Sequence, residues 1–176
     1  MDVSLFSARY TVRPLDQRDI PDILALCREN TLFYQYCPPF VTAQKIMDDM
    51  KALPPKKEMH DKHYVGYYDA GRLIAVMDFI MAYPDRHTAF IGFFMTEVSI
   101  QNIGTGSSII SELCDYLSLI GIARVRLGWV RGNPQSEHFW HKNGFTETGF
   151  TYDTNGYTVI VAQRLLQISM EEKDPV

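Results

Sequence analysis

The stretch from Thr88 to Ile120 places a loop with two closely spaced glycines between an apolar strand and an amphipathic helix. Thr88 to Val98 is rich in aromatic and apolar residues, which is typical of a buried strand. A helix N-terminus exposes unpaired N–H groups and a partial positive charge, and glycine lets a ligand approach the backbone closely. The unit therefore predicts an anion site, suited to phosphate or pyrophosphate, in the loop Gln101 to Gly106. The apolar face expected for the helix consists of Ile109, Ile110, Leu113, Leu117 and Ile120.

The glycine spacing does not by itself decide which anion binds. A dinucleotide-binding GxGxxG motif would need a third glycine where Ile109 stands. A P-loop GxxxxGK[ST] is absent, and Gly104 to Ser108 does not supply the GxSxG of a nucleophile elbow. Two glycines at a helix start can also have a purely structural role, and the loop alone leaves that alternative open.

In the rest of the sequence, the spacing of apolar residues alternates between that of helices and that of strands. Pro54-Pro55 breaks the polar segment Lys51 to Lys62, which we expect to be a loop, and the aromatic stretch Thr31 to Phe40 is expected to be irregular. The order indicates an α/β protein with a mixed sheet and helices on its faces, forming one domain over residues 1–168 with a loose tail at 169–176. Helices are expected at Asp19–Asn30, from Thr42 onward, at Gly104–Ile120 and at Pro134–Asn143, and strands at His63–Tyr68, Arg72–Ala82, Thr88–Val98, Val125–Val130, Phe145–Tyr152 and Thr158–Leu165.

Charge and composition narrow the class of protein. The formal net charge of −4 gives no electrostatic reason to expect a nucleic-acid partner. The three cysteines form no CxxC pair, which favours reduced thiols over disulfides or a metal site. We find neither a signal-peptide pattern nor an apolar run of about 20 residues. A soluble cytoplasmic protein without a membrane partner is therefore expected.

Two motifs at a particular separation resemble the GNAT superfamily of acyl-CoA N-acyltransferases. The family loop Q/R-x-x-G-x-G/A stands here as Gln101-Asn102-Ile103-Gly104-Thr105-Gly106. Downstream, an Asn opens a short helix that ends in an aromatic-x-K-x-G-F run, here Asn133-Pro134 and then Phe139 to Phe145. The order of elements from Tyr10 to Leu165 also matches. The resemblance implies a GNAT-like mixed, mostly antiparallel central sheet flanked by helices.

The resemblance further implies that acetyl-CoA is the cosubstrate. Backbone atoms of the strand that ends at Thr96 would pair with the pantetheine arm. A bulge in this strand would separate it from the strand Val125–Val130 and open a slot for the thioester. Backbone N–H groups from Asn102 to Ser107 would hold the pyrophosphate. Asn133 would bind the pantetheine region, with a helix cap as its structural alternative. The implied binding residues are Phe94, Met95, Thr96, Gln101, Asn102, Ile103, Gly104, Thr105, Gly106, Ser107 and Asn133.

The implied reaction is direct attack of an amine, from a small molecule or a peptide, on the acetyl carbonyl. Trp140 stands where the family usually has an acidic tyrosine, and an indole cannot protonate a thiolate. His138, His141, Tyr152 or water could replace that tyrosine. A non-catalytic acyl-CoA-binding or sensor module is therefore an alternative function.

The general base is also open. Phe90 and Gly92 occupy positions where some family members carry a base. Asp78 interrupts an apolar strand, and Glu97 follows the strand that precedes the loop. We consider both as candidate catalytic carboxylates, with Asp78 first, although either can be an ordinary solvent-facing or ion-paired residue.

The remaining candidate sites are weaker. His60-x-x-His63 and His138-x-x-His141 each lack a third ligand nearby in the sequence, so no metal is expected. The resemblance suggests that the aromatic cluster between the first two helices lines the acceptor pocket, although packing in the core explains such residues equally well. A homodimer is an open alternative. The aromatic cluster consists of Phe33, Tyr34, Tyr36 and Phe40.

Overall fold

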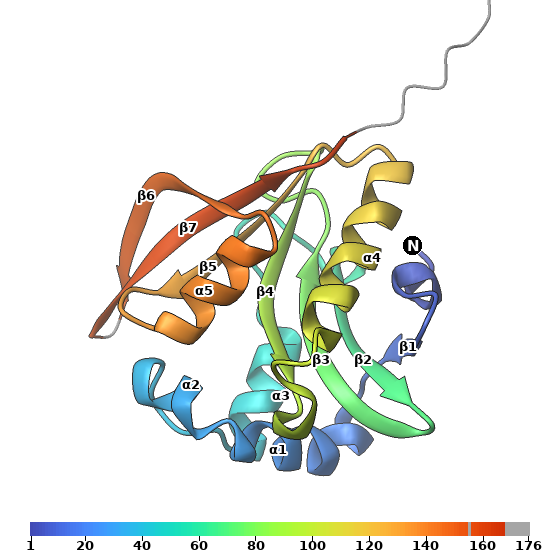
Figure 1. Cartoon of the computed structure of the whole chain (residues 1–176), viewed down its shortest axis with the longest axis vertical. Helices are drawn as coiled ribbons and strands as arrows, with labels where there is room; N and C mark the ends of the chain where they lie inside the picture. Colours follow the sequence, from blue (N-terminus) through green and yellow to red (C-terminus); the bar gives the residue numbers. More distant parts are fainter. Residues whose placement is uncertain (155, 168–176) are drawn as a thin grey trace, which may run out of the picture.

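The computed structural model describes residues 1–154 and 156–167 (Figure 1). Its centre is a seven-stranded sheet in the order β1-β2-β3-β4-β5-β7-β6. The β4–β5 pair is parallel, and the other neighbouring strands are antiparallel. This confirms the expected mixed, mostly antiparallel sheet. The strands are β1 (Thr11–Pro14), β2 (Lys62–Asp69), β3 (Arg72–Ile80), β4 (Thr88–Thr96), β5 (Arg124–Val130), β6 (Thr146–Thr154) and β7 (Tyr157–Leu165).

Helices cover both faces of the sheet. On one face, α4 and α5 pack over a core that contains Phe79, Leu113 and Leu127 (Figure 1). On the other face, α1 and α3 bury Ile23 and Ile46 against the sheet. Within the described residues, none of the helices is long and apolar enough to cross a membrane. The helices are α1 (Ile20–Glu29), α2 (Thr31–Tyr36), α3 (Ala43–Lys51), α4 (Thr105–Leu119) and α5 (Pro134–Lys142).

Three expectations were wrong. The stretch expected to be irregular contains α2, whose Phe33 packs against Tyr34 and Phe93 at ring-centroid distances of 5.0 and 5.8 Å. The sequence pattern also missed β1, because only one residue of this short strand is buried. Ile120 is 44% exposed rather than on the apolar face, because α4 ends at Leu119. Asn155 and the expected tail lie outside the described residues.

Strands β4 and β5 pair over only part of their length. The pairing runs from Thr88 with Arg124 to Ile91 with Leu127 and then stops. At the same level β3 pairs Asp78 with Phe93 and Phe79 with Ile91, so Gly92 is an extra residue on β4. A bulge of this kind bends its strand. The two strands therefore part beyond Ile91, as the resemblance implied.

A buried ion pair lies directly behind the bulge. Lys62 Nζ donates to both oxygens of Asp78, at 2.7 and 2.8 Å. The side chains of Lys62 and Asp78 are 1% and 15% exposed. A Cβ atom at Gly92 would lie 2.9 Å from Asp78 Oδ2. Only glycine therefore fits at the bulge while the ion pair keeps this position.

We expect Lys62→Met to reduce the free energy of unfolding by about 3–5 kcal/mol, because it leaves the Asp78 carboxylate buried without a counter-charge. The double variant Lys62→Met/Asp78→Leu should recover most of this loss, since it removes both charges. Urea unfolding at pH 7 measures both effects. A loss of less than about 1 kcal/mol in the single variant would show that water, rather than Lys62, compensates the carboxylate.

Candidate functional site

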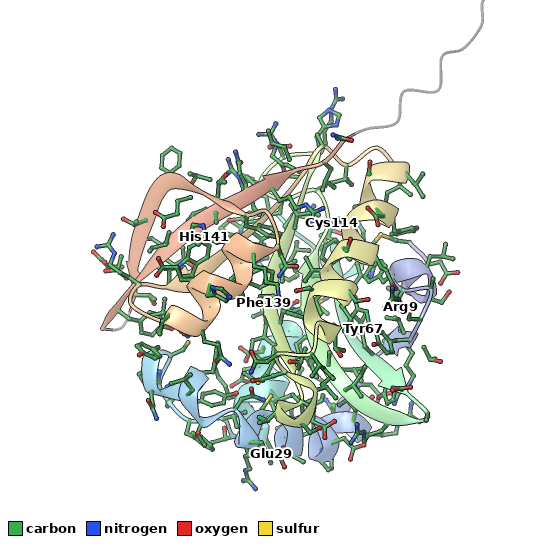
Figure 2. The ribbon with its side chains drawn as sticks, in the orientation of Figure 1. Arg9, Glu29, Tyr67, Cys114, Phe139 and His141 are labelled. Carbon is green, nitrogen blue, oxygen red and sulfur yellow. The ribbon has the colours of Figure 1, made fainter. Side chains whose placement is uncertain are left out.

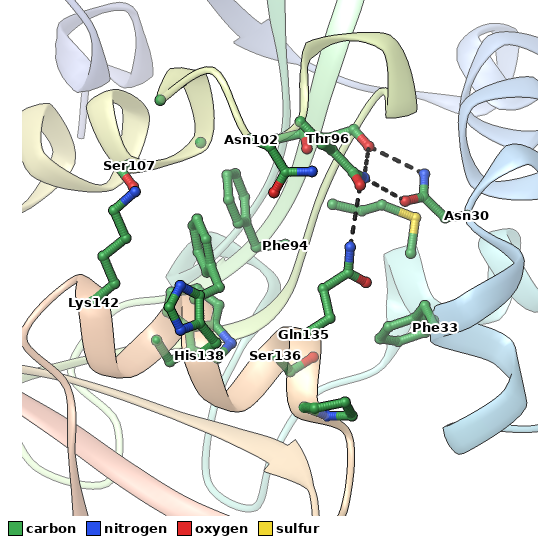
Figure 3. A pocket seen from close by; sticks show the side chains of 17 residues that line it. Asn30, Phe33, Phe94, Thr96, Asn102, Ser107, Gln135, Ser136, His138 and Lys142 are labelled. Carbon is green, nitrogen blue, oxygen red and sulfur yellow. Dashed lines mark hydrogen bonds between the residues drawn. The ribbon is translucent and has the colours of Figure 1, made fainter.

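A cavity of about 480 Å³ lies between the end of β4, the loop that follows it, the start of α4 and one side of α5 (Figure 3). Its lining combines aromatic side chains with backbone-rich and amide-rich segments. The lining residues are Asn30, Phe33, Phe94, Met95, Thr96, Gln101, Asn102, Gly104, Gly106, Ser107, Pro134, Gln135, Ser136, His138, Phe139, Trp140 and Lys142.

The loop before α4 turns through two left-handed residues. Asn102 has φ 62° and Gly104 has φ 95°. Gly104 is the N-cap of α4, and no side chain caps this end of the helix. The first N–H groups of α4 therefore lack a side-chain acceptor, and Gly104, Gly106 and Ser107 line the cavity. This arrangement suits an anionic group of a ligand.

The two glycines of the loop have different physical roles. Gly104 supplies the left-handed backbone that begins α4, where other residues are strained. Gly106 allows α4 to approach α5, since an added Cβ would lie 3.1 Å from Phe139 Cε2. Figure 2 shows Phe139 between these two helices. The loop is thus fixed by conformation at one glycine and by packing at the other.

An amide network holds the loop at the cavity wall (Figure 3). Gln101 Nε2 donates to Asn30 Oδ1 at 2.7 Å and to the Thr96 carbonyl at 3.3 Å. Asn30, which is 8% exposed, also donates to the Thr96 carbonyl at 3.1 Å. Gln135 Nε2 donates to Gln101 Oε1 at 3.1 Å. The network connects the end of α1, the end of β4 and the start of α5 through Gln101.

The α5 wall is closed by aromatic packing. Asn133 is 2% exposed and caps α5, accepting a hydrogen bond from the Ser136 amide at 3.2 Å. Trp140 is 7% exposed, and its ring lies 6.0 Å from that of Phe94 and 4.9 Å from that of Phe139. The indole that replaces the usual tyrosine therefore forms part of the wall between the helices and β4.

A smaller cavity of about 210 Å³ adjoins the first. Both cavities are lined by Phe33, Phe94, Ser136 and Trp140. Residues on both sides of the parting strands, among them Gly92 and Gly128, line the smaller one. The two cavities therefore meet where β4 leaves β5.

The structure brings most of the expected binding residues together. Asn133 lines the smaller cavity. Ile103 and Thr105 line neither cavity, and Ile103 is 73% exposed. The expected residues that line the larger cavity are Phe94, Met95, Thr96, Gln101, Asn102, Gly104, Gly106 and Ser107.

The two candidate carboxylates stand outside both cavity walls. Asp78 lies behind Gly92. Burial raises the pKa of the Asp78 carboxyl above its ordinary value, and the hydrogen bonds from Lys62 partly offset this rise. Glu97 Oε1 lies 3.1 Å from Arg72 Nη1 and accepts a hydrogen bond from Ser99 Oγ at 3.0 Å. Asp78 is therefore the carboxylate nearer to the parting of the strands.

Several residues of the larger cavity were not among the binding residues expected from the sequence. Asn30 needs the three-dimensional fold to reach the loop. Gln135, His138 and Lys142, together with Phe139, follow the i, i+3, i+4, i+7 spacing of one helix face, a signal that could have found them. Figure 3 shows the Lys142 side chain extending toward Ser107. A cation thus stands beside the uncapped start of α4.

Among the described residues, the two histidine pairs noted in the sequence do not come together in a group that could hold a metal ion. His138 lines the larger cavity, whereas the His141 ring packs on Trp129 at 5.4 Å. His63 packs on Phe6 and Phe79. A different group within the described residues, Glu137, His141 and Glu147, has its ligand atoms within 4.8 Å of one another. All three are exposed, and exposed acidic groups of this kind are common without a metal ion.

Comparisons with known proteins agree with this geometry. The family model described as "Acetyltransferase (GNAT) family" matches residues 26–145. The chain therefore belongs to the GNAT family of acetyltransferases. No curated protein sequence gives a significant match.

Solved structures share the fold at low sequence identity. An acetyltransferase from Thermus thermophilus has a TM-score of 0.71 at 16% identity, covering 94% of this chain and 100% of its own. The ribosomal-protein-S18-alanine N-acetyltransferase from Escherichia coli has a TM-score of 0.64 at 16% identity, with coverages of 95% and 99%. The PaiA N-acetyltransferase from Thermoplasma acidophilum, solved in complex with coenzyme A, has a TM-score of 0.63 at 17% identity, with coverages of 89% and 98%.

We expect Gln101→Ala to lower the free energy of unfolding by about 1 kcal/mol, because it removes the donor to the buried Asn30 amide oxygen. Gln135→Ala is the matched control: it removes one exposed hydrogen bond to the same glutamine and should change stability by less than about 0.5 kcal/mol. Urea unfolding compares the two variants. Equal losses would show that the inner part of the network contributes no more than its exposed end.

Proposed function

We propose that the protein is an acetyl-CoA-dependent N-acetyltransferase that moves an acetyl group to an amine of a small molecule or peptide by direct attack. The observation that carries this proposal is the larger cavity, which combines the uncapped start of α4 with the unpaired side of β4. Family membership supports the same cosubstrate. Structural neighbours include a ribosomal-protein alanine acetyltransferase and a spermidine acetyltransferase, so the fold leaves the acceptor open.

The residues present fit coenzyme A in two ways. The first N–H groups of α4 and the Lys142 ammonium supply donors for a pyrophosphate. From Gly92 onward, β4 has no partner on its β5 side, so an extended amide-containing arm could pair with Phe94 and Met95. The Thr96 carbonyl is less available, because it already accepts from Asn30 and Gln101.

The reaction forms a C–N bond and breaks a C–S bond. Acetyl-CoA supplies the activated acyl group. The chain must orient an uncharged amine, exclude water and accept or supply protons. Trp140 cannot donate a proton to a thiolate. Of the other groups considered for this task, His138 lines the larger cavity and Tyr152 the smaller, whereas His141 lines neither.

We propose that Asp78 accepts the proton of the attacking amine through a water molecule, because Asp78 is the candidate carboxylate next to the parting of the strands. Its raised pKa brings its proton affinity closer to that of an amine. Glu97 is the second candidate, although its pairing with Arg72 and Ser99 places it beside the strand end instead.

The test of cofactor binding is thermal stability. At about 100 times its dissociation constant, acetyl-CoA should stabilise the protein by about 2.7 kcal/mol, which raises Tm by about 5–10 °C. Lys142→Met should weaken this binding about fivefold, whereas Lys51→Met, at an exposed position on α3, should leave it unchanged. A panel of amines should then release free thiol from acetyl-CoA. Binding without turnover of any amine would instead favour the non-catalytic binding module.

The test of the proton acceptor is the pH dependence of kcat/KM. Asp78→Asn should lower kcat/KM by about 100-fold. The acidic limb of the pH profile should then no longer show the ionisation of the Asp78 carboxyl and should show only the ionisation of the amine substrate. The matched variant Glu97→Gln should stay within about twofold of the parent. Thermal melting of both variants controls for loss of folding. An unchanged pH profile in Asp78→Asn would contradict the assignment of the amine proton to Asp78.

A further inference from the structure

The smaller cavity has the position that a second substrate needs. Its floor is formed by Ile91 and Gly92 of β4 and by Leu127 and Gly128 of β5. Because the two strands stop pairing after Ile91 and Leu127, the floor opens toward the larger cavity at Trp140. A molecule held here would lie next to whatever occupies the slot between the strands.

The wall of this cavity carries no charged side chain and combines apolar residues with neutral polar ones. Among the described residues that line it, none is Asp, Glu, Lys, Arg or His. The aromatic rings in the wall pack on one another: Phe33 lies 5.8 Å from Phe93, and Trp140 lies 6.0 Å from Phe94. These rings therefore pack edge to face or tilted against one another, and among the described lining residues no carboxylate accompanies them to complete a site for a cation.

The polar groups of the cavity are neutral. Tyr157 and Cys37 are hydrogen bonded at 3.4 Å, and this bond, with partial burial, raises the pKa of Tyr157 to about 12. Burial also raises the pKa of Tyr152, whose hydroxyl lies 3.8 Å from the position of a Cβ atom at Gly128. Asn133 Oδ1 accepts the hydrogen bond that caps α5. The Tyr152 phenol lies beside Gly128 at the parting of the strands, where it could accept a hydrogen bond from, or donate one to, the nitrogen of a bound amine.

The nearest carboxylate is already neutralised by an ion pair. Asp78 Oδ2 lies beside Gly92, 2.9 Å from the position of a Cβ atom there, and both carboxylate oxygens accept hydrogen bonds from Lys62. A ligand with a second ammonium group would bury that charge without a partner, which is costly. A single reacting amine is different, because an apolar wall favours the uncharged form that attack requires.

We infer that the acceptor is a small monoamine with an apolar body, such as an arylalkylamine or a short alkylamine, and not a polyamine or a lysine-rich peptide. This inference rests on the proposed function. The volume of about 210 Å³ is below the range of about 300–1,000 Å³ that holds drug-sized ligands, so the part of the acceptor held inside this cavity is limited to one ring or a short chain.

Calorimetric binding to the protein saturated with coenzyme A tests the inference without requiring turnover. We expect 2-phenylethylamine and isopentylamine to bind at least tenfold more tightly than spermidine or a lysine-rich peptide. Equal or tighter binding of spermidine or the peptide would overturn the inference, as would the absence of binding by either monoamine at millimolar concentration. Binding of the monoamines without thiol release from acetyl-CoA would contradict the proposed function while supporting the acceptor class.

A matched pair of variants at Cys37 tests the physical reason. Cys37 lines only the smaller of the two cavities. Cys37→Asp places a carboxylate in the wall and should tighten spermidine binding about tenfold, whereas Cys37→Asn has the same shape without the charge and should not. Equal spermidine affinities in the two variants, both shown to be folded by thermal melting, would show that missing counter-charge does not set the selectivity.

Discussion

Among the described residues, β4 has no strand partner on its β5 side beyond Ile91 and Leu127, and the smaller cavity lies at this parting. The parting begins at the extra residue Gly92, where a side chain would meet the Asp78 carboxylate. Asp78 in turn is held by Lys62, a fully buried cation. The buried ion pair therefore restricts the residue at the bulge, where the strands open, to glycine.

Sequence periodicity predicted the elements that are long and regular. The strand, loop and helix around Gly104 were predicted because glycine chemistry and apolar spacing agree there. The strand β1 and helix α2 were missed because a strand with one buried residue has no period, and α2 is stabilised by aromatic contacts with β4 rather than by its own pattern. The sequence marked Asp78 as an unusual charge, but its partner lies across a hairpin and required the strand register.

The cavity walls are poor in charged groups that could transfer protons. Trp140 fills the place of an acidic hydroxyl and packs into the aromatic wall of α5. The two cavities share Trp140, Phe33, Phe94 and Ser136, so the same side chains would shape both the proposed acceptor site and the slot beside it. Under the proposed function, much of the rate enhancement would come from orientation and desolvation, which these residues provide together.

The unpaired side of β4 also has a consequence for aggregation. An exposed row of backbone donors and acceptors is a template on which other extended chains assemble. Here Phe139 and Trp140 of α5 pack on the Phe94 ring, at 5.9 and 6.0 Å, and so lie beside this row. The short helix α5 consequently hinders other chains from pairing with β4, in addition to forming a wall of the cavity. Local unfolding of α5 would expose the unpaired side of β4, with which another extended chain could pair. A ligand bound along β4 would reduce this exposure.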